Sequence, residues 1–318
     1  MRCTRWLCVI GLCVAGEALL IYAALADWSP GGTAKPRAKC PAAASAGLPP
    51  VFVFNPGANA TPKIGLALAT AYDEEYAALA AVSLPNKRAY AARHGLALFV
   101  IGPAGIACDR PASWSKVLAT AAALGMTVGV STGGRTTDGG GRSAAALRAD
   151  ATPGHEWALY MDSDAIFANI DAALEDGEHL ARAMNDPAVH MIIARDRPSG
   201  GRINNGVFLL RRSNWTEHFL GVVWNATQFL LDAPGQRNSR FGDQRAFEFA
   251  IEQAEAEAEL SQSPGHPVAY VPQREINSFP STYKSGDIII HIAGCLAGAR
   301  RSRPQCAAEL GRWAAKGA

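Results

Sequence analysis

The stretch WALYMDSDAIF, residues 157–167, places two carboxylates inside an otherwise apolar run. Asp162 and Asp164 are two positions apart, so in an extended strand both side chains face the same way. A carboxylate resists burial unless it is paired or bound to a cation. Divalent cations prefer oxygen ligands, and diphosphate oxygens can complete their coordination. We therefore expect a buried strand over 156–167 that holds a Mn²⁺ or Mg²⁺ site; a surface turn with two solvated acids is the alternative.

Apolar strands and helical patterns alternate on both sides of this stretch. We expect further strands over 64–72, 96–101, 189–195, 203–211, 268–271 and 288–292, and helices over 74–94, 113–124, 174–185, 215–231 and 244–260. Such alternation is typical of an α/β fold, with a mainly parallel central sheet and helices on both faces. Residues 129–154 are rich in Gly, Ser and Thr and are interpreted as an insertion, either a variable surface loop or a lid.

Composition limits the class of protein. The chain has 318 residues, of which 49% are hydrophobic and 18% charged, and its formal net charge is +2. This length suffices for one large α/β domain, and the composition is not that of a disordered chain. The nearly neutral charge lacks the basic stripe of a nucleic-acid-binding protein, so no nucleic-acid partner is expected.

The N-terminus predicts entry into the secretory pathway. Residues 6–26 are almost all apolar and follow Arg2 and Arg5. The run is long enough to cross a bilayer, and the basic residues before it favour a cytosolic N-terminus. We expect a cytosolic tail, a transmembrane signal anchor, a stalk and a lumenal domain over 1–5, 6–26, 27–50 and 51–318. A cleaved signal peptide is the alternative, because Ala24-Leu25-Ala26 resembles a signal-peptidase site.

The cysteines fit that compartment. Four lie beyond the apolar run, namely Cys40, Cys108, Cys295 and Cys306. An even number is consistent with disulfides, and Cys295 and Cys306 are the expected pair because they close a short loop. Zinc is the alternative, but the spacing lacks a Cys-x-x-Cys pair. Glycosylation sequons at Asn59, Asn214 and Asn225 would suit a secretory glycoprotein.

Other residues have two interpretations each when taken alone. His291 in its apolar strand is either a core residue or a metal ligand, and Gly294 beyond it allows close backbone approach. Asp243 at a helix start is either an N-cap or part of an anion site. Lys116 is either a surface residue or a phosphate contact.

Taken in order, these patterns resemble the signature of glycosyltransferase family 34. The motifs are Trp114-x-Lys116, Asp162-Ser163-Asp164, Asn204-Asn205-Gly206-x-Phe208, Gly242-Asp243-Gln244 and His291-x-Ala293-Gly294-Cys295. Three supporting segments are Tyr90 to Gly95, Leu209 to Arg211 with Trp215, and Ile276 to Pro280. The resemblance extends from Ile64 to Cys295, which is most of the predicted lumenal domain.

The resemblance implies a nucleotide-sugar-binding domain of the GT-A type, with Mn²⁺ and retention of anomeric configuration. Carried onto matching positions, three residues would hold the ion: Asp162, Asp164 and His291. Donor sugar or phosphates would be bound by Lys116, Ser163, Asn204 and Gly294. Asp243 and Gln244 would lie near the anomeric carbon as catalytic residues. Same-face attack is the favoured route to retention, with Asp243 as nucleophile the alternative.

The implied activity is transfer of a hexose or pentose by a Golgi type II membrane protein. The donor would be UDP-galactose, UDP-xylose or GDP-mannose, and the acceptor a polysaccharide or a protein-linked glycan. Leu96 replaces the usual aromatic residue after His-Gly, and the insertion over 129–154 is long for the family; both affect the choice of acceptor. The alternatives are a transferase of another GT-A family and a non-catalytic nucleotide-sugar-binding lumenal subunit. Donor, linkage and assembly as a homo- or hetero-oligomer stay open.

Overall fold

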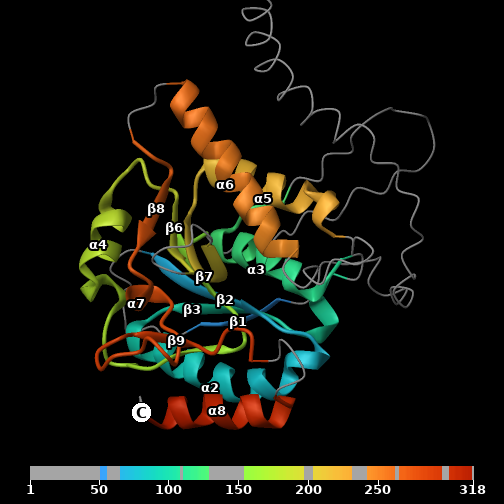
Figure 1. Ribbon diagram of the computed structural model, residues 1–318, viewed down its shortest axis with the longest axis vertical. Coiled ribbons are helices and arrows are strands. Elements are labelled where there is room, and N and C mark those ends of the chain that lie inside the picture. Colours follow the sequence, from blue (N-terminus) through green and yellow to red (C-terminus); the bar gives the residue numbers. More distant parts are fainter. Residues whose placement is uncertain are drawn as a thin grey trace, which may run out of the picture. The chain divides into compact units, whose positions relative to one another are not determined.

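A seven-stranded sheet forms the centre of the domain (Figure 1). The computed structural model describes residues 51–55, 65–107, 110–128, 154–196, 203–230, 242–261, 265–295 and 301–316, all within the unit Cys40–Ala318. Among these residues, no helix is both long and apolar enough to cross a bilayer. The predicted anchor and stalk lie outside the described residues, as do Cys40, Cys108, Asn59 and nearly all of the insertion over 129–154.

The strand order of this sheet is β1-β3-β2-β4-β7-β6-β8. Its strands are β1 (Val51–Phe54), β2 (Leu66–Ala71), β3 (Ala97–Ile101), β4 (Trp157–Met161), β6 (Met191–Arg195), β7 (Ile203–Arg211) and β8 (Val268–Val271). Strand β2 is parallel to β3 and β4, and β6 is parallel to β8. Only β1 and β7 run against their neighbours in this sheet. The described part of the chain therefore confirms a mainly parallel sheet.

The expectation of one strand over 156–167 is wrong. Strand β4 ends at Met161, and β5 (Ala165–Phe167) instead pairs antiparallel with β9 (Ile289–His291) in a second, two-stranded sheet. The chain turns between them, with Ala165 N donating to Asp162 O at 3.1 Å. The two carboxylates therefore lie in a turn, where strand alternation does not orient them. The β5–β9 register places Ala165 opposite His291.

The predicted helices are confirmed, with ends that differ by up to six residues from the predicted ones. They are α2 (Ala77–His94), α3 (Ser115–Leu124), α4 (Glu178–Asn185), α5 (Asn214–Asn225) and α6 (Gly242–Leu260). Four of the predicted spans overlap separate 3₁₀ turns, at Glu74–Tyr76, Ala112–Trp114, Leu174–Asp176 and Thr227–Phe229. Helix α2 ends at Gly95, whose φ of 70° is the left-handed conformation that favours glycine at a helix end.

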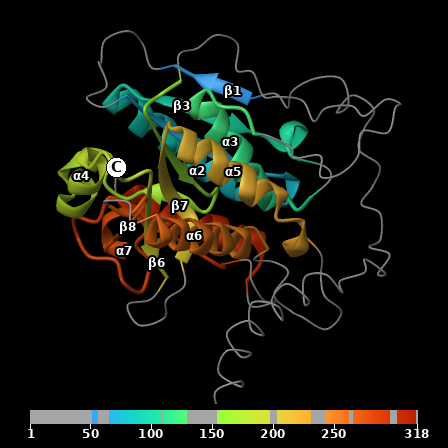
Figure 2. The same cartoon turned by 90° about the horizontal axis from the view of Figure 1, so that it is seen from above.

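Helices cover both faces of the sheet, as predicted. On β2, Ala67 and Ala69 face the core shared with α3, α5 and α6, whereas Leu66 and Leu68 face the core shared with α2 and α4. Figure 1 shows α2 on the opposite side of the sheet from α5 and α6, and in Figure 2 α5 and α6 run side by side. The small alanine side chains of β2 allow α3 to pack closely against the strand.

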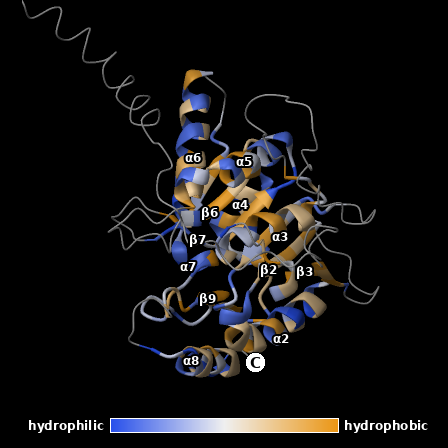
Figure 3. Cartoon of the chain, turned by 90° about the vertical axis from the view of Figure 1, so that its right-hand side faces the viewer, coloured by the Kyte–Doolittle hydropathy of each residue, from blue (hydrophilic) through white to orange (hydrophobic). Residues whose placement is uncertain are grey.

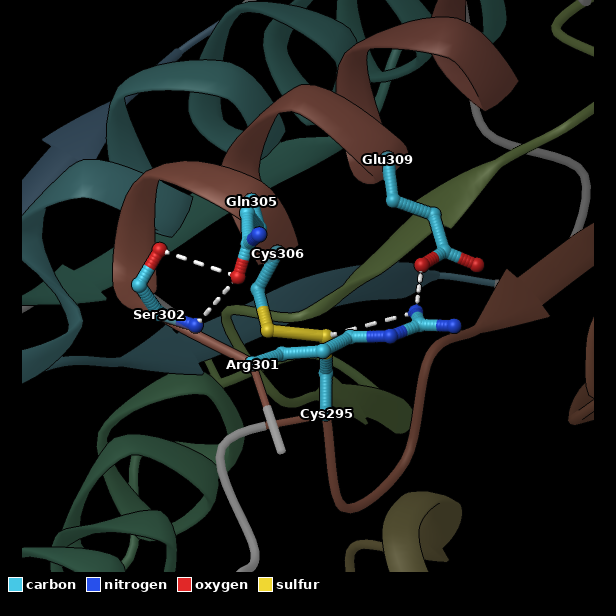
Figure 4. The surroundings of a disulfide bond; sticks show 6 residues. All are labelled: Cys295, Arg301, Ser302, Gln305, Cys306 and Glu309. Atoms are coloured by element: carbon cyan, nitrogen blue, oxygen red, sulfur yellow. Dashed lines mark hydrogen bonds and ion pairs between the residues drawn. A yellow bond between two sulfur atoms is a disulfide. The ribbon is translucent and has the colours of Figure 1, made fainter. Parts of the chain in front are cut away.

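Two helices near the C-terminus were not predicted: the short α7 (Gln273–Ile276) and α8 (Arg303–Lys316). Helix α8 carries both hydrophilic and hydrophobic residues (Figure 3) and packs on α2, with Cys306 and Leu310 buried against Leu79. The predicted disulfide between Cys295 and Cys306 is confirmed, with a Cα–Cα distance of 5.9 Å (Figure 4). This bond fastens the segment that follows β9 to the start of α8.

Candidate active site

Asp162, Asp164 and His291 converge at the turn between β4 and β5. One ligand atom from each lies within 4.8 Å of those of the other two. Asp164 and His291 are buried, whereas Asp162 is half-buried. Two carboxylates and an imidazole are a donor set that fits Mn²⁺ or Mg²⁺. The residues present therefore suit the divalent cation that the motif implies.

Hydrogen bonds fix the orientation of the His291 ring. Its Nδ1 donates to Asn277 Oδ1 at 2.9 Å, and Asn277 Nδ2 in turn donates to Asn204 Oδ1 at 3.0 Å. This leaves Nε2 facing Asp164 Oδ1 at 3.1 Å. Such an outer partner selects the tautomer whose other nitrogen can ligate a metal. Asn204 therefore supports the predicted ligand His291 through Asn277.

The carboxylates control the protonation of His291. Burial lowers the pKa of His291, but the neighbouring carboxylates of Asp164 and Asp162 outweigh burial and raise it above its ordinary value. Burial raises the pKa of Asp164, yet His291 reverses that effect and holds it below its usual range. Without a cation, these shifts favour an imidazolium next to a carboxylate. A divalent cation that binds here takes the place of the imidazolium proton.

Gly206 of β7 makes room for this cluster. A Cβ at this position would lie 2.2 Å from His291 Cε1 and 2.9 Å from Asp162 Oδ2. Both distances are shorter than any tolerated contact, so a larger residue would displace the imidazole or the carboxylate. Glycine in the Asn204-Asn205-Gly206 motif is thus required by the close approach of the metal-binding side chains.

Lys116 and Asp243 form a second buried cluster beside the first. Lys116 Nζ lies 2.8 Å from Asp243 Oδ2 and 3.5 Å from Asp162 Oδ1. It also donates to Asn205 O at 3.1 Å and to Asn205 Oδ1 at 3.2 Å, while Asn205 Nδ2 donates to Asp243 Oδ2 at 3.0 Å. The ammonium is therefore taken up by internal partners, and a contact between Lys116 and donor phosphates stays a prediction.

The protonation states of this second cluster are fixed. Burial lowers the pKa of Lys116, but Asp162 and Asp243 more than offset burial and raise it. Burial raises the pKa of Asp243, but Lys116 and hydrogen bonds lower it below its usual range. Burial raises the pKa of Asp162, and the ammonium of Lys116 offsets only part of this rise. Lys116 and Asp243 consequently stay charged at neutral pH.

The remaining predicted residues surround these clusters. Ser163 is buried between the two carboxylates, and Gln244 is half-exposed directly after Asp243 in α6. Gly294 is exposed and adopts a left-handed φ of 70° just after β9. Their roles in donor binding and catalysis stay predictions.

The site also contains residues that sequence reasoning did not assign. Tyr160 donates its hydroxyl proton to Asp162 Oδ1 at 2.9 Å. Lys87 of α2 is buried, and burial lowers its pKa to about 7 in spite of the nearby Asp162 and Asp164. Lys87 follows Leu79 and Ser83 at helical spacing on the buried face of α2. A charge at a position that the helical pattern assigns to the core was the signal that could have identified it.

Comparison with known families agrees with the motifs of the second half of the chain. The galactosyl transferase GMA12/MNN10 family matches residues 179–302. This span includes the Asn204, Asp243 and His291 motifs and excludes those of Lys116 and Asp162. The match confirms the resemblance to family 34. No curated protein sequence matches the chain.

Solved structures share the fold. A glycosyltransferase involved in glycosylation of the major capsid of PBCV-1 is 14% identical, with a TM-score of 0.50; the match covers 78% of this chain and 98% of that one. The glycosyltransferase GlyE of Streptococcus pneumoniae TIGR4 is 13% identical, with a TM-score of 0.39 over 79% of this chain and 62% of that one. The first similarity supports a mixed α/β fold like that of GT-A proteins.

Proposed function

We propose that this chain, a glycosyltransferase by its family match and its fold, is a metal-dependent enzyme that retains anomeric configuration. It would move a hexose or pentose from a nucleotide-sugar to a glycan acceptor. The convergence of Asp162, Asp164 and His291 within 4.8 Å is the observation that supports this proposal most directly. A structural role does not require a buried carboxylate, a half-buried carboxylate and an imidazole to meet at one point, because taking charge out of water is costly without a cation.

Asp162, Asp164 and His291 would hold Mn²⁺ or Mg²⁺. When bound, the cation supplies positive charge next to the diphosphate leaving group. Asn277 keeps the His291 ring in the ligating orientation by accepting from Nδ1. Tyr160 and Lys116 both contact Asp162 Oδ1, through a hydrogen bond at 2.9 Å and an ion pair at 3.5 Å.

The surroundings of Asp243 favour same-face attack over a covalent intermediate. Its carboxylate is engaged by Lys116 at 2.8 Å and by Asn205 at 3.0 Å, so both its charge and its position are already in use. We assign Asp243 the role of holding Lys116 and Asn205 in place. The acceptor hydroxyl oxygen then bonds to the anomeric carbon as the bond to the diphosphate oxygen breaks, and the departing phosphate takes the hydroxyl proton. Gln244 would support the cationic sugar of the transition state.

We propose that the donor is one of UDP-galactose, UDP-xylose or GDP-mannose, and that the acceptor is a polysaccharide or a protein-linked glycan. The test is release of nucleoside diphosphate from each donor by the purified full chain in detergent, with Mn²⁺, with Mg²⁺ or with EDTA. We expect turnover of one donor that requires the cation and is lost in Asp164→Asn. A non-catalytic subunit would bind a donor without releasing the diphosphate. Turnover that survives both EDTA and Asp164→Asn would contradict the proposal.

We also propose that residues 6–26 anchor the protein in the Golgi membrane, with the catalytic domain in the lumen. The support is the apolar run after Arg2 and Arg5. In cells that express the full chain, we expect the protein to resist alkaline extraction from membranes. An antibody epitope at the C-terminus should be protected from added protease until the membranes are opened. Release of the chain by alkali would instead indicate a cleaved signal peptide.

A further inference from the structure

Helix α2 presents two adjacent polar side chains to the turn that carries the metal-binding carboxylates. Lys87 Nζ donates to Asp162 O at 2.7 Å, to Met161 O at 3.5 Å and to Thr70 Oγ1 at 3.2 Å. Thr70 Oγ1 donates to Met161 O at 2.7 Å. On the other side of the turn, Asn86 Nδ2 donates to Phe167 O at 2.9 Å and Asn86 Oδ1 accepts from Phe167 N at 2.8 Å. The turn is therefore tied to α2 both before Asp162 and after Asp164.

We propose that Lys87 is a positioning residue for the metal site: its ammonium holds the backbone of residues 161 and 162 against α2 and thereby sets the direction of the Asp162 and Asp164 carboxylates. The inference rests on the proposed function, because it assigns Lys87 to the same cation site. Lys87 contacts the backbone carbonyls of Met161 and Asp162. It therefore acts through Asp162 and is not itself a catalytic residue.

The position of Lys87 is hard to explain by stability alone. Its side chain is 1% exposed, and a buried ammonium is costly because it loses its hydration. An apolar side chain of similar length at such a site is often as stable or more stable. The hydrogen bonds that the structure gives Lys87 go to Thr70 and to the backbone of residues 161 and 162. These contacts concentrate its effect on the turn.

Three roles for Lys87 predict different effects on cation binding. A positioning role predicts that loss of the side chain weakens binding, because the carboxylates lose their fixed direction. A purely electrostatic role predicts tighter binding, since Lys87 is a cation near Asp162 and Asp164 and would repel a second cation. A purely structural role predicts lower stability with unchanged affinity of the folded protein. Thr70 separates the first two, because its hydroxyl holds Met161 O without any charge.

The test is titration of the full chain with Mn²⁺ alone, followed by electron paramagnetic resonance of free Mn²⁺. The variants are Lys87→Met, Thr70→Val and, as a matched control on the same helix, Arg88→Met, which removes an exposed cation that lies over the Phe54 ring. We expect a Kd for Mn²⁺ raised about tenfold or more in Lys87→Met. Thr70→Val should raise it by less, and Arg88→Met should leave it unchanged. Circular dichroism should show that all three variants are folded.

Two results would overturn the inference while leaving the proposed function standing. One is wild-type Mn²⁺ affinity in folded Lys87→Met; the other is tighter binding in Lys87→Met with no change in Thr70→Val. If Lys87→Met does not fold, Thr70→Val decides, and an unchanged Kd in that variant overturns the inference. Absence of Mn²⁺ binding by the wild-type chain would overturn both the proposed function and this inference.

Discussion

Two buried carboxylates of the candidate site, Asp164 and Asp243, differ in the partner that each one faces. Asp164 meets the imidazole of His291 at 3.1 Å, whereas Asp243 meets the ammonium of Lys116 at 2.8 Å. Both have a pKa below the usual range once their partners offset the effect of burial. A histidine releases its proton near neutral pH, but a lysine in an ion pair does not. The Asp164–His291 pair can therefore exchange a proton for a cation, whereas the Asp243–Lys116 pair keeps its proton and its ion pair.

The difference shows that a motif acid acquires its role from its neighbours. Asp162-Ser163-Asp164 and Gly242-Asp243-Gln244 both place an acid at a predicted active site, and sequence alone allowed Asp243 to be a nucleophile. In the structure, Asn205 and Lys116 satisfy the Asp243 carboxylate. We therefore propose a supporting role for Asp243, while Asp164 and His291 would face the proposed cation.

The largest effect that separates the two acids is expected in Asp164→Ala. Turnover should fall to the level of the EDTA-treated wild type, because a ligand of the proposed cation is lost, while the fold persists. In the parallel variant Asp243→Asn, which keeps the side-chain shape, Mn²⁺ affinity should change by less than about tenfold, since the carboxylate is not a ligand. The measurements are nucleoside diphosphate release and Mn²⁺ titration. Full activity in Asp164→Ala would show that the cation site is wrongly assigned.

The second expected effect is the contribution of the Lys116–Asp243 ion pair to the stability of the protein. Lys116→Met leaves the Asp243 carboxylate buried without its cation, so the free energy of unfolding should fall by about 3–5 kcal/mol. The double variant Lys116→Met with Asp243→Leu should recover much of this loss, because it removes both charges together. Urea denaturation of the wild type, Lys116→Met, Asp243→Leu and the double variant forms a double-mutant cycle that isolates the interaction between the two side chains. A small effect of Lys116→Met would mean that water or another cation replaces the ammonium.

A smaller effect is expected where Gly206 of β7 lies against His291 of the Asp164–His291 pair. In Gly206→Ala, the new Cβ would meet His291 Cε1 at 2.2 Å, so the ring has to move. Overpacking of this kind costs about 1–3 kcal/mol of stability. Mn²⁺ affinity should fall at the same time because Nε2 is displaced from its position beside Asp164. Thermal unfolding and Mn²⁺ titration measure the two effects, and wild-type affinity in this variant would indicate that His291 does not ligate the cation.

Much of the fold could be predicted from hydrophobic patterns, and the errors of that prediction have physical causes. The apolar residues on both sides of Asp162 and Asp164 favoured one continuous strand over the alternative of a turn, but the turn is set by distant contacts such as Asp162 N donating to Gly206 O at 2.7 Å. Helix α8 did have a signal: Ser302 N donates to Gln305 Oε1 at 2.8 Å, which is half of a capping box. Its buried Cys306 and Leu310 are also four residues apart.

The grouping of the proposed metal ligands could be predicted from the sequence, whereas the residues that support them could not. The resemblance to family 34 grouped Asp162, Asp164 and His291, which the structure brings together; taken alone, His291 was either a core residue or a ligand. Nothing in the spacing of Lys116 and Asp243 indicated that they would meet, because their contact depends on where α3 and α6 pack on the sheet. The ion pair between them could be found only after the helices were placed.

The dependence of cation binding on pH is the smallest effect, and it compares the two pairs directly. The raised pKa of His291 means that a proton competes with Mn²⁺ below that pKa, so the Kd should rise by about tenfold for each unit that the pH falls. Above the pKa of His291 the Kd should level off. Lys116 and Asp243 should contribute no slope near neutral pH, because the pKa of one is raised and that of the other lowered.

Stability of the cation-free protein should have the opposite slope. A histidine whose pKa is raised by folding stabilises the protein at pH values below its unfolded pKa, and this contribution is lost as the pH rises through the folded pKa. Asp164, with a lowered pKa, adds stability that is lost only as the pH falls toward that pKa. His291→Gln should abolish both slopes near neutral pH while the Lys116–Asp243 pair remains. Mn²⁺ titrations and urea denaturation at several pH values around neutrality measure the two slopes. Identical slopes in His291→Gln and the wild type would exclude His291 as the exchanging group.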